Sequence, residues 1–193
     1  TKLQLTLEQG VLGPPIKLTR AECERIVYEY RKANQNIKAL WKHMDGIISS
    51  MTLGLNGTHG ILSFGKNYIR LPNKMFLQYY GLHGETVSTY GGINVVEATY
   101  LTRMGRSKLY GGLLTENVVQ ALARIVIAEQ MLKISDAGYR IVTMTHDEIV
   151  CIAPDSEAQN CLDFMLQTMS TPPDWAPDLP LAAEGGFDSC YSK

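Results

Sequence analysis

The residues with the clearest chemical potential are the adjacent carboxylates Asp147 and Glu148, which follow Thr145 and His146 between two short apolar runs. Two like charges this close repel each other, so the pair gains nothing structurally. Mg²⁺ suits such a pair because it prefers hard oxygen ligands, keeps several waters and takes only one or two protein carboxylates. Two metals can clamp the attacking and leaving oxygens of a phosphoryl transfer. The open alternative is a simple solvated turn, where acidic residues are common.

The flanking residues predict a β-hairpin that carries these groups at its tip. Residues 140–145 and 149–152 are apolar and β-branched, and the short polar link between them suits a turn. Before the hairpin, a helix is expected from about residue 116 to 135, with Thr115 as its N-cap. After it, Ser156 and Gln159 predict a capping box that opens a helix to about residue 169. A Pro-rich stretch and a short strand at 181–184 complete this half.

The first half predicts one long amphipathic helix followed by short strands. Thr19 and Glu22 form a capping-box pattern. Apolar residues then recur at helical spacing as far as Ile48. Turn-forming residues separate expected strands at 60–64, 68–71 and 75–80. Residues 81–112 are Gly-rich and predict no definite element, but they contain a small basic cluster of Arg103, Arg106 and Lys108.

Composition indicates a folded chain of the α+β class, with long helices and a small antiparallel sheet. Of the 193 residues, 45% are hydrophobic and 19% charged, which excludes a disordered chain. The net charge of −1 provides no global basic field for nucleic acid, although a local basic face remains open. The four cysteines are widely spaced and predict reduced thiols, not a zinc site. No secretory signal and no run of about 20 apolar residues is evident, so we expect a cytoplasmic protein without a membrane partner.

Four blocks resemble family A DNA polymerases, the group of bacterial polymerase I and phage replicative enzymes. Residues 144–150 (Met-Thr-His-Asp-Glu-Ile-Val) resemble motif C, and residues 115–121 resemble the start of the palm helix that precedes it. Residues 181–187, with Tyr191 and Lys193, resemble the closing segment of phage members. The pattern at 26–41 resembles the helix after the nucleotide-binding helix of the fingers. The blocks occur in the family's order and span nearly the whole chain.

The resemblance implies roles for individual residues. Asp147 would be a ligand of the catalytic metals, with Glu148 as a weaker or indirect ligand. His146 would contact the primer's 3′-terminal region. Gln120 would face the minor groove, where acceptors common to all base pairs can report pairing geometry. The metal would be Mg²⁺, in a two-metal site completed by residues outside this chain.

Further contacts are less specific. Arg124, one helical turn after Gln120, could reach a phosphate, and Arg103, Arg106 and Lys108 could hold backbone phosphates. Each of these basic residues could equally be an ordinary solvated side chain. Position 125 is Ile where phage relatives are expected to carry an acidic residue, which puts one local contact of the palm helix in doubt.

The resemblance predicts that residues 1–112 form the C-terminal part of the fingers with connecting strands, and that residues 113–193 form the C-terminal part of the palm. The implied function is DNA-directed DNA synthesis on primer-template DNA with dNTPs. No motif A or motif B pattern occurs here, so an N-terminal polymerase polypeptide carrying both is expected as a partner. A split gene, an intein product and an expression fragment all stay open as reasons for a chain that starts at Thr1.

Two alternatives stay open. One is a non-catalytic palm-like module that binds DNA or a protein. The other is a metal-dependent phosphoesterase built on Asp147 and Glu148, which the scattered positions of His43, His59 and His83 disfavour.

Overall fold

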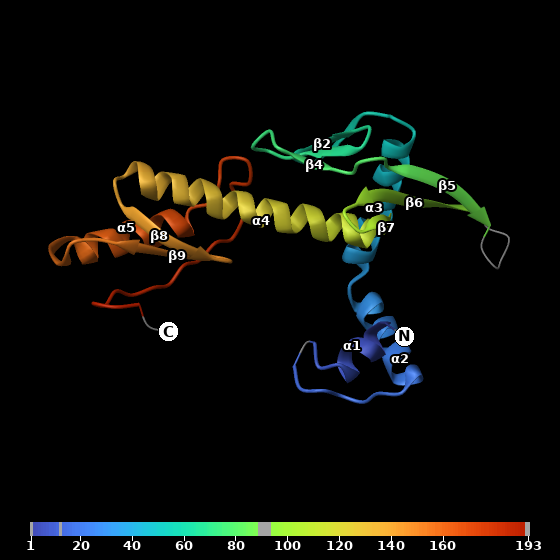
Figure 1. The fold of residues 1–193 in the computed structure, drawn as a ribbon, viewed down its shortest axis with the longest axis horizontal. Coiled ribbons are helices and arrows are strands. Elements are labelled where there is room, and N and C mark those ends of the chain that lie inside the picture. The colour runs from blue at the N-terminus through green and yellow to red at the C-terminus, as the bar shows by residue number, and fades with distance from the viewer. Residues whose placement is uncertain (1, 12, 89–93, 192–193) are drawn as a thin grey trace. The chain divides into compact units, whose positions relative to one another are not determined.

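The computed structural model describes residues 2–11, 13–88 and 94–191, so that Thr1 and Lys193 lie outside the described residues. It confirms the α+β class, because long helices alternate with small antiparallel sheets (Figure 1). The chain forms two compact units. Residues 1–55 and 80–115 make up the first, and residues 56–79 and 116–193 make up the second.

The first unit contains three helices and a three-stranded antiparallel sheet. The helices are α1 (Lys2–Glu8), α2 (Arg20–Ala33) and α3 (Gln35–Thr52), and the strands are β5 (His83–Ser88), β6 (Asn94–Thr102) and β7 (Gly105–Leu109), in the order β5-β6-β7. The core of this unit lies where one face of α3 meets the sheet. It buries Met44, Ile47, Ile48, Met51, Ala98 and Leu109.

The Thr19–Glu22 capping box is confirmed, because both reciprocal hydrogen bonds are present. The prediction of one continuous helix to Ile48 is wrong, because the chain breaks between α2 and α3 at Asn34. There the amide nitrogens of the backbone and of the Asn34 side chain both donate to the carbonyl of Tyr30, at 3.0 and 2.8 Å. A short amide side chain that competes for backbone groups in this way ends a helix.

The second unit begins with a four-stranded antiparallel sheet. Its strands are β1 (Gly57–His59), β2 (Leu62–Gly65), β3 (Tyr68–Arg70) and β4 (Phe76–Gln78), in sequence order. These strands confirm the predicted run of short strands to within a few residues. The edge of the Tyr68 ring meets Phe76, with centroids 5.2 Å apart. Asn117 Nδ2 donates to the Tyr79 hydroxyl at 3.0 Å, which ties the end of this segment to α4 (Gly111–Asp136).

Helix α4 begins earlier than its sequence predicts. Thr115 was expected as the N-cap, but it lies inside the helix, where its hydroxyl donates to the Gly111 carbonyl at 2.7 Å. The Asp45 carboxylate of α3 instead accepts from the Gly111 amide at 2.5 Å. A carboxylate at this end satisfies an otherwise unpaired N–H and favours the positive end of the helix dipole.

The rest of the second unit follows α4. It contains the strands β8 (Arg140–Thr145) and β9 (Glu148–Ile152), the short 3₁₀ turn η1 (Asp155–Glu157) and α5 (Ala158–Ser170), coloured orange in Figure 1. The predicted Ser156–Gln159 capping box does not form. Ser156 lies in η1, and Gln159 Nε2 donates to Asp163 Oδ1 at 2.7 Å. Residues 181–184 are described and irregular, so the predicted last strand is also wrong.

By length and composition, α4 could cross a membrane, with a mean hydropathy of 1.2 over its most apolar window. Core helices of globular proteins meet the same criterion, and two polar side chains of α4, Glu129 and Gln130, have hydrogen-bond partners within the second unit. The Trp175 indole donates to the Glu129 carboxylate at 3.1 and 3.2 Å, and Gln130 Nε2 donates to the Met169 carbonyl at 2.9 Å. The helix itself was expected, but its membrane-spanning length and hydropathy were not, because no unbroken run of about 20 apolar residues is present.

Candidate active site

The hairpin predicted around Asp147 is present. β8 and β9 pair antiparallel, and the Thr145–Glu148 pair closes a two-residue turn made by His146 and Asp147. His146 has a φ of 54°. A positive φ is what the two-residue hairpin turns of types I′ and II′ require at their first central position. Histidine is one of the few non-glycine residues enriched in this region of backbone space. Glu148 is therefore the first residue of β9 and not a turn residue.

A register shift gives the hairpin one apolar face. The pairing is irregular between Ile141 and Thr143, so Val142 is the extra residue of a bulge. Because of this bulge, Ile141 and Met144 lie on the same face of the hairpin, where they pair with Cys151 and Ile149 of β9. Ile149 is buried on this face. Because side chains alternate along a strand, Glu148 projects from the other face.

The carboxylates at the tip differ in environment. Asp147 and His146 are exposed, whereas Glu148 is half-buried. The Tyr191 hydroxyl donates to Glu148 Oε1 at 3.0 Å. Nothing in the sequence assigned this contact, although Tyr191 belongs to one of the blocks that carry the resemblance.

The donor set at the tip fits part of a magnesium site. Among the described residues, no group of three or more His, Cys, Asp or Glu side chains could hold a metal. Mg²⁺ takes only one or two carboxylates from protein when waters and substrate phosphates provide the rest, and Asp147 and Glu148 are the residues that would supply them. The rival phosphoesterase gains no support, because His43, His59 and His83 lie on α3, β1 and β5 and join no such group within the described chain.

Helix α4 carries two of the predicted residues, and one of them, Arg124, contacts the hairpin. Arg124 Nη1 lies 3.0 Å from the Met144 sulfur, on the strand that leads to the turn. Gln120 lies one turn earlier on the same helix face, and its Nε2 donates to Glu116 Oε1 at 3.2 Å. Both side chains are exposed and open to a ligand. Ile125 is buried with 5% exposure, so this position contributes to the core of the second unit.

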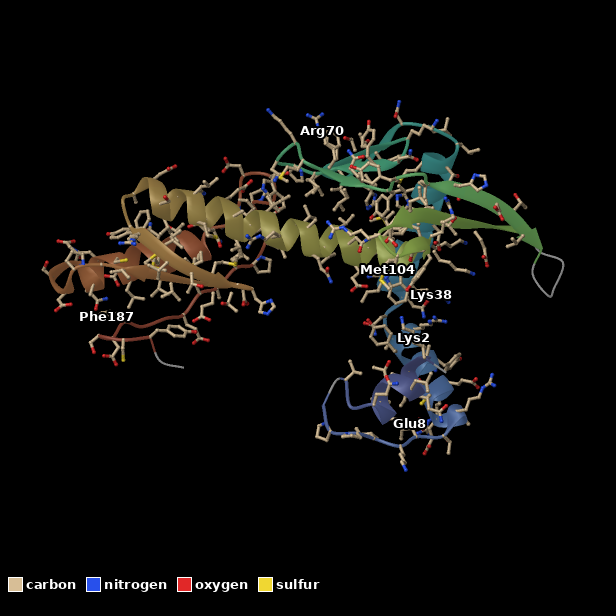
Figure 2. The ribbon with its side chains drawn as sticks, in the orientation of Figure 1. Lys2, Glu8, Lys38, Arg70, Met104 and Phe187 are labelled. Carbon is tan, nitrogen blue, oxygen red and sulfur yellow. The ribbon has the colours of Figure 1, made fainter. Side chains whose placement is uncertain are left out.

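The basic cluster belongs to the first unit, where two of its three members have internal contacts. Arg106 donates to the Thr99 hydroxyl, the Gly81 carbonyl and the Thr99 carbonyl at 2.9, 2.9 and 3.0 Å. Lys108 Nζ lies 2.8 Å from Glu97 Oε2. Arg103 is exposed at the turn between β6 and β7, beside Met104, which is labelled in Figure 2. The sequence did not indicate these internal contacts of Arg106 and Lys108.

The hairpin also carries a thiol that is unsuited to nucleophilic chemistry. Burial, reinforced by the neighbouring Cys161, raises the pKa of the Cys151 thiol to about 11. Burial also raises the pKa of Cys161. Because the thiolate is the reactive form, a raised pKa lowers the reactivity of both thiols at neutral pH. Among the described residues, all four cysteines are free thiols.

Comparison with known proteins gives one informative relative. The chain is 30% identical to a DNA polymerase of Bacillus phage SP02, over an alignment of 195 residues that covers 97% of the chain. It spans about 30% of the length of that curated relative. No family model matches the chain, and no solved structure matches it. Over nearly its whole length, the chain is therefore related to part of a phage DNA polymerase.

Proposed function

We propose that this chain is the C-terminal portion of a family A DNA-directed DNA polymerase, and that it supplies the motif C carboxylates for nucleotide transfer to a primer 3′-OH. The observation that carries the proposal is the similarity of 97% of the chain to a phage DNA polymerase. The hairpin supports it, because an exposed carboxylate at a two-residue turn can approach a large substrate such as a primer terminus.

In this proposal Asp147 and Glu148 would hold Mg²⁺, and the metal would supply electrostatic stabilisation of the phosphoryl group during transfer. Asp147, at the turn, is the more accessible ligand, and Glu148 stands one residue behind it on β9. His146 would contact the primer's 3′ end, because the turn exposes its imidazole beside Asp147. The host cytoplasm would be the place of action of such a phage enzyme.

Helix α4 would act as part of the primer grip. Gln120 could donate to minor-groove acceptors without reading sequence, and Arg124 could reach a phosphate from its position over Met144. In the first unit, Arg103 is exposed for a phosphate contact, while Arg106 and Lys108 would have to exchange their internal partners. We assign residues 1–112 to the fingers and connecting strands, and residues 113–193 to the palm.

The remaining catalytic groups would come from a polypeptide that carries motifs A and B. The test compares three preparations in primer extension with Mg²⁺ and dNTPs: this chain alone, the complementing polypeptide alone, and the two together. We expect incorporation only from the pair, because Asp147 and Glu148 cannot fix two metals by themselves. An inert but stable pair that still binds primer-template DNA would indicate a non-catalytic module. Extension by the purified chain alone would contradict the shared metal site.

A hydrolysis assay addresses the remaining alternative. A self-sufficient phosphoesterase should cleave an activated phosphodiester without any partner, and the cleavage should depend on Asp147. We expect no such cleavage, since the described chain brings together no set of three metal-ligating side chains.

A further inference from the structure

A hydrogen bond joins the hairpin to a residue 43 positions away. The Tyr191 hydroxyl donates to Glu148 Oε1 at 3.0 Å. Both residues belong to the second unit, so this contact lies within one compact part of the chain. The two residues are far apart in the sequence, and the acceptor is the side chain of the residue after Asp147, not the backbone of the hairpin.

The segment that carries Tyr191 contacts α5 six residues before Tyr191. A Cβ atom added at Gly185 would lie 3.4 Å from Leu162 Cδ1 and 3.7 Å from Leu166 Cδ2, so the backbone here packs on α5. Asp188 Oδ1 then accepts from the Ser189 amide at 2.6 Å, beside a bend at residues 189–190. Figure 2 labels Phe187 on this segment, in the same unit as β8 and β9. The segment therefore contacts α5 at Gly185, and the residues from there to Tyr191 are exposed.

A tyrosine is a suitable partner for a carboxylate that must keep its charge. Its hydroxyl is a neutral donor, and at 3.0 Å the bond to Glu148 is at the long end of the O–H···O range, which suits an orienting contact more than a strong one. Lys or Arg at this position would cancel part of the negative charge that attracts a cation. A glutamate side chain has several rotatable bonds, and a fixed donor selects among its rotamers before a metal arrives.

We propose that Tyr191 is a positioning residue that orients the Glu148 carboxylate for divalent metal binding beside Asp147. This inference rests on the proposed function, since it assigns Glu148 to the metal site. Outer partners of metal ligands are generally worth about 10- to 100-fold in metal affinity or activity. Tyr191 is 62% exposed. We therefore expect a smaller effect of roughly threefold to tenfold, in line with the modest net value of a solvent-exposed hydrogen bond.

The test uses Tyr191→Phe, which removes only the hydroxyl, with Tyr139→Phe as the matched control. The Tyr139 ring packs against Phe164 in the same unit, with centroids 5.6 Å apart. Each variant is assembled with the complementing polypeptide and primer-template DNA. Three quantities are measured: Mn²⁺ binding from the loss of the free-ion EPR signal, the Mg²⁺ concentration for half-maximal single-turnover incorporation, and the free energy of unfolding of the chain.

We expect Tyr191→Phe to weaken Mn²⁺ binding and raise the Mg²⁺ midpoint by similar factors, while the rate at saturating Mg²⁺ stays close to that of the unsubstituted protein. Tyr139→Phe should shift neither metal curve. Metal curves that coincide for Tyr191→Phe and the unsubstituted protein would overturn the positioning role, and so would a change confined to the free energy of unfolding. Asp147→Ala tests the proposed function separately from the role of Tyr191. If Asp147→Ala abolishes incorporation while Tyr191→Phe changes neither metal curve, the proposed function stands and only the role of Tyr191 falls. If Asp147→Ala is also silent, both fall.

Discussion

Replacing Asp147 by Asn should separate catalysis from folding. Asn has nearly the same size and shape as Asp but lacks the charge that a metal requires. Asp147 is exposed at a two-residue turn, and the ladder pairs of the hairpin begin only at Thr145 and Glu148. The hairpin backbone therefore loses nothing when the charge is removed.

The expected magnitudes follow from this position. Surface substitutions away from caps, cores and networks usually change the free energy of unfolding by less than about 0.5 kcal/mol. Loss of one preorganised electrostatic partner of a transition state costs on the order of 10²- to 10³-fold in turnover, or about 2.7–4 kcal/mol. DNA affinity should change little, because the carboxylate acts mainly on charge that develops during the reaction.

The assay is single-turnover dNTP incorporation on a primed template by the assembled polymerase, run beside a DNA-binding titration and urea unfolding of the chain. Asp174→Asn is the matched control, since Asp174 is also an exposed acid of the second unit. It should leave all three quantities unchanged. A rate for Asp147→Asn close to that of Asp174→Asn would refute the catalytic assignment, and the tip would then be a solvated turn.

Two neighbours of Asp147 should give graded effects in the same assays. Glu148→Gln should reduce the rate less than Asp147→Asn, because the resemblance implies a weaker or indirect ligand. His146→Asn removes the imidazole but keeps a residue that tolerates the φ of 54°. We therefore expect a modest loss of rate with unchanged stability. Equal and complete loss from all three substitutions would contradict this ranking.

The remaining predictions concern the structure that supports the site. Asp45→Ala should lower the free energy of unfolding by about 1–2 kcal/mol in urea, because the Gly111 amide at the start of α4 loses its carboxylate acceptor. Asp45→Asn keeps an acceptor oxygen and should lower the free energy of unfolding by less. Arg106→Ala should lower the free energy of unfolding by about 1–2 kcal/mol, because the hydrogen bonds to Gly81 and Thr99 are lost. Arg106→Lys should not restore this stability, since one ammonium group cannot reproduce the geometry of the guanidinium. An unchanged unfolding curve would show that Arg106 is a solvated or DNA-contacting side chain instead. The pKa of Cys151 is raised from an ordinary 9.0 to about 11, so the folded state holds the thiol proton more tightly than the unfolded state does. The protonated thiol therefore contributes to the free energy of unfolding, fully below pH 9, and this contribution is lost as the pH rises through 11. Iodoacetamide at pH 8 should accordingly modify the exposed Cys190 well before Cys151, as read by peptide mass spectrometry, and equal rates would show that the burial of Cys151 is wrong.

Local patterns were sufficient wherever neighbouring residues decide the structure. The Thr19–Glu22 box involves groups three residues apart, so its letters alone predict the start of α2. The β8–β9 hairpin follows from two apolar runs and a short polar link, and it puts Asp147 at a turn whatever the rest of the chain does. The α+β class likewise follows from the two kinds of apolar spacing.

Contacts between distant residues decided the rest. Helix α4 starts at Gly111 because Asp45, 66 residues away, accepts its amide, and no pattern near Thr115 contains that information. The break at Asn34 depends on a competition between a side chain and the backbone, whose outcome spacing does not reveal. The partner of Glu148 is Tyr191, 43 residues later, and only the path of the intervening chain over α5 brings the two together. The sequence alone thus singled out Asp147 and Glu148 as candidate metal ligands, whereas only the tertiary structure shows that Tyr191 donates to one of them, because that contact joins groups that only folding makes neighbours.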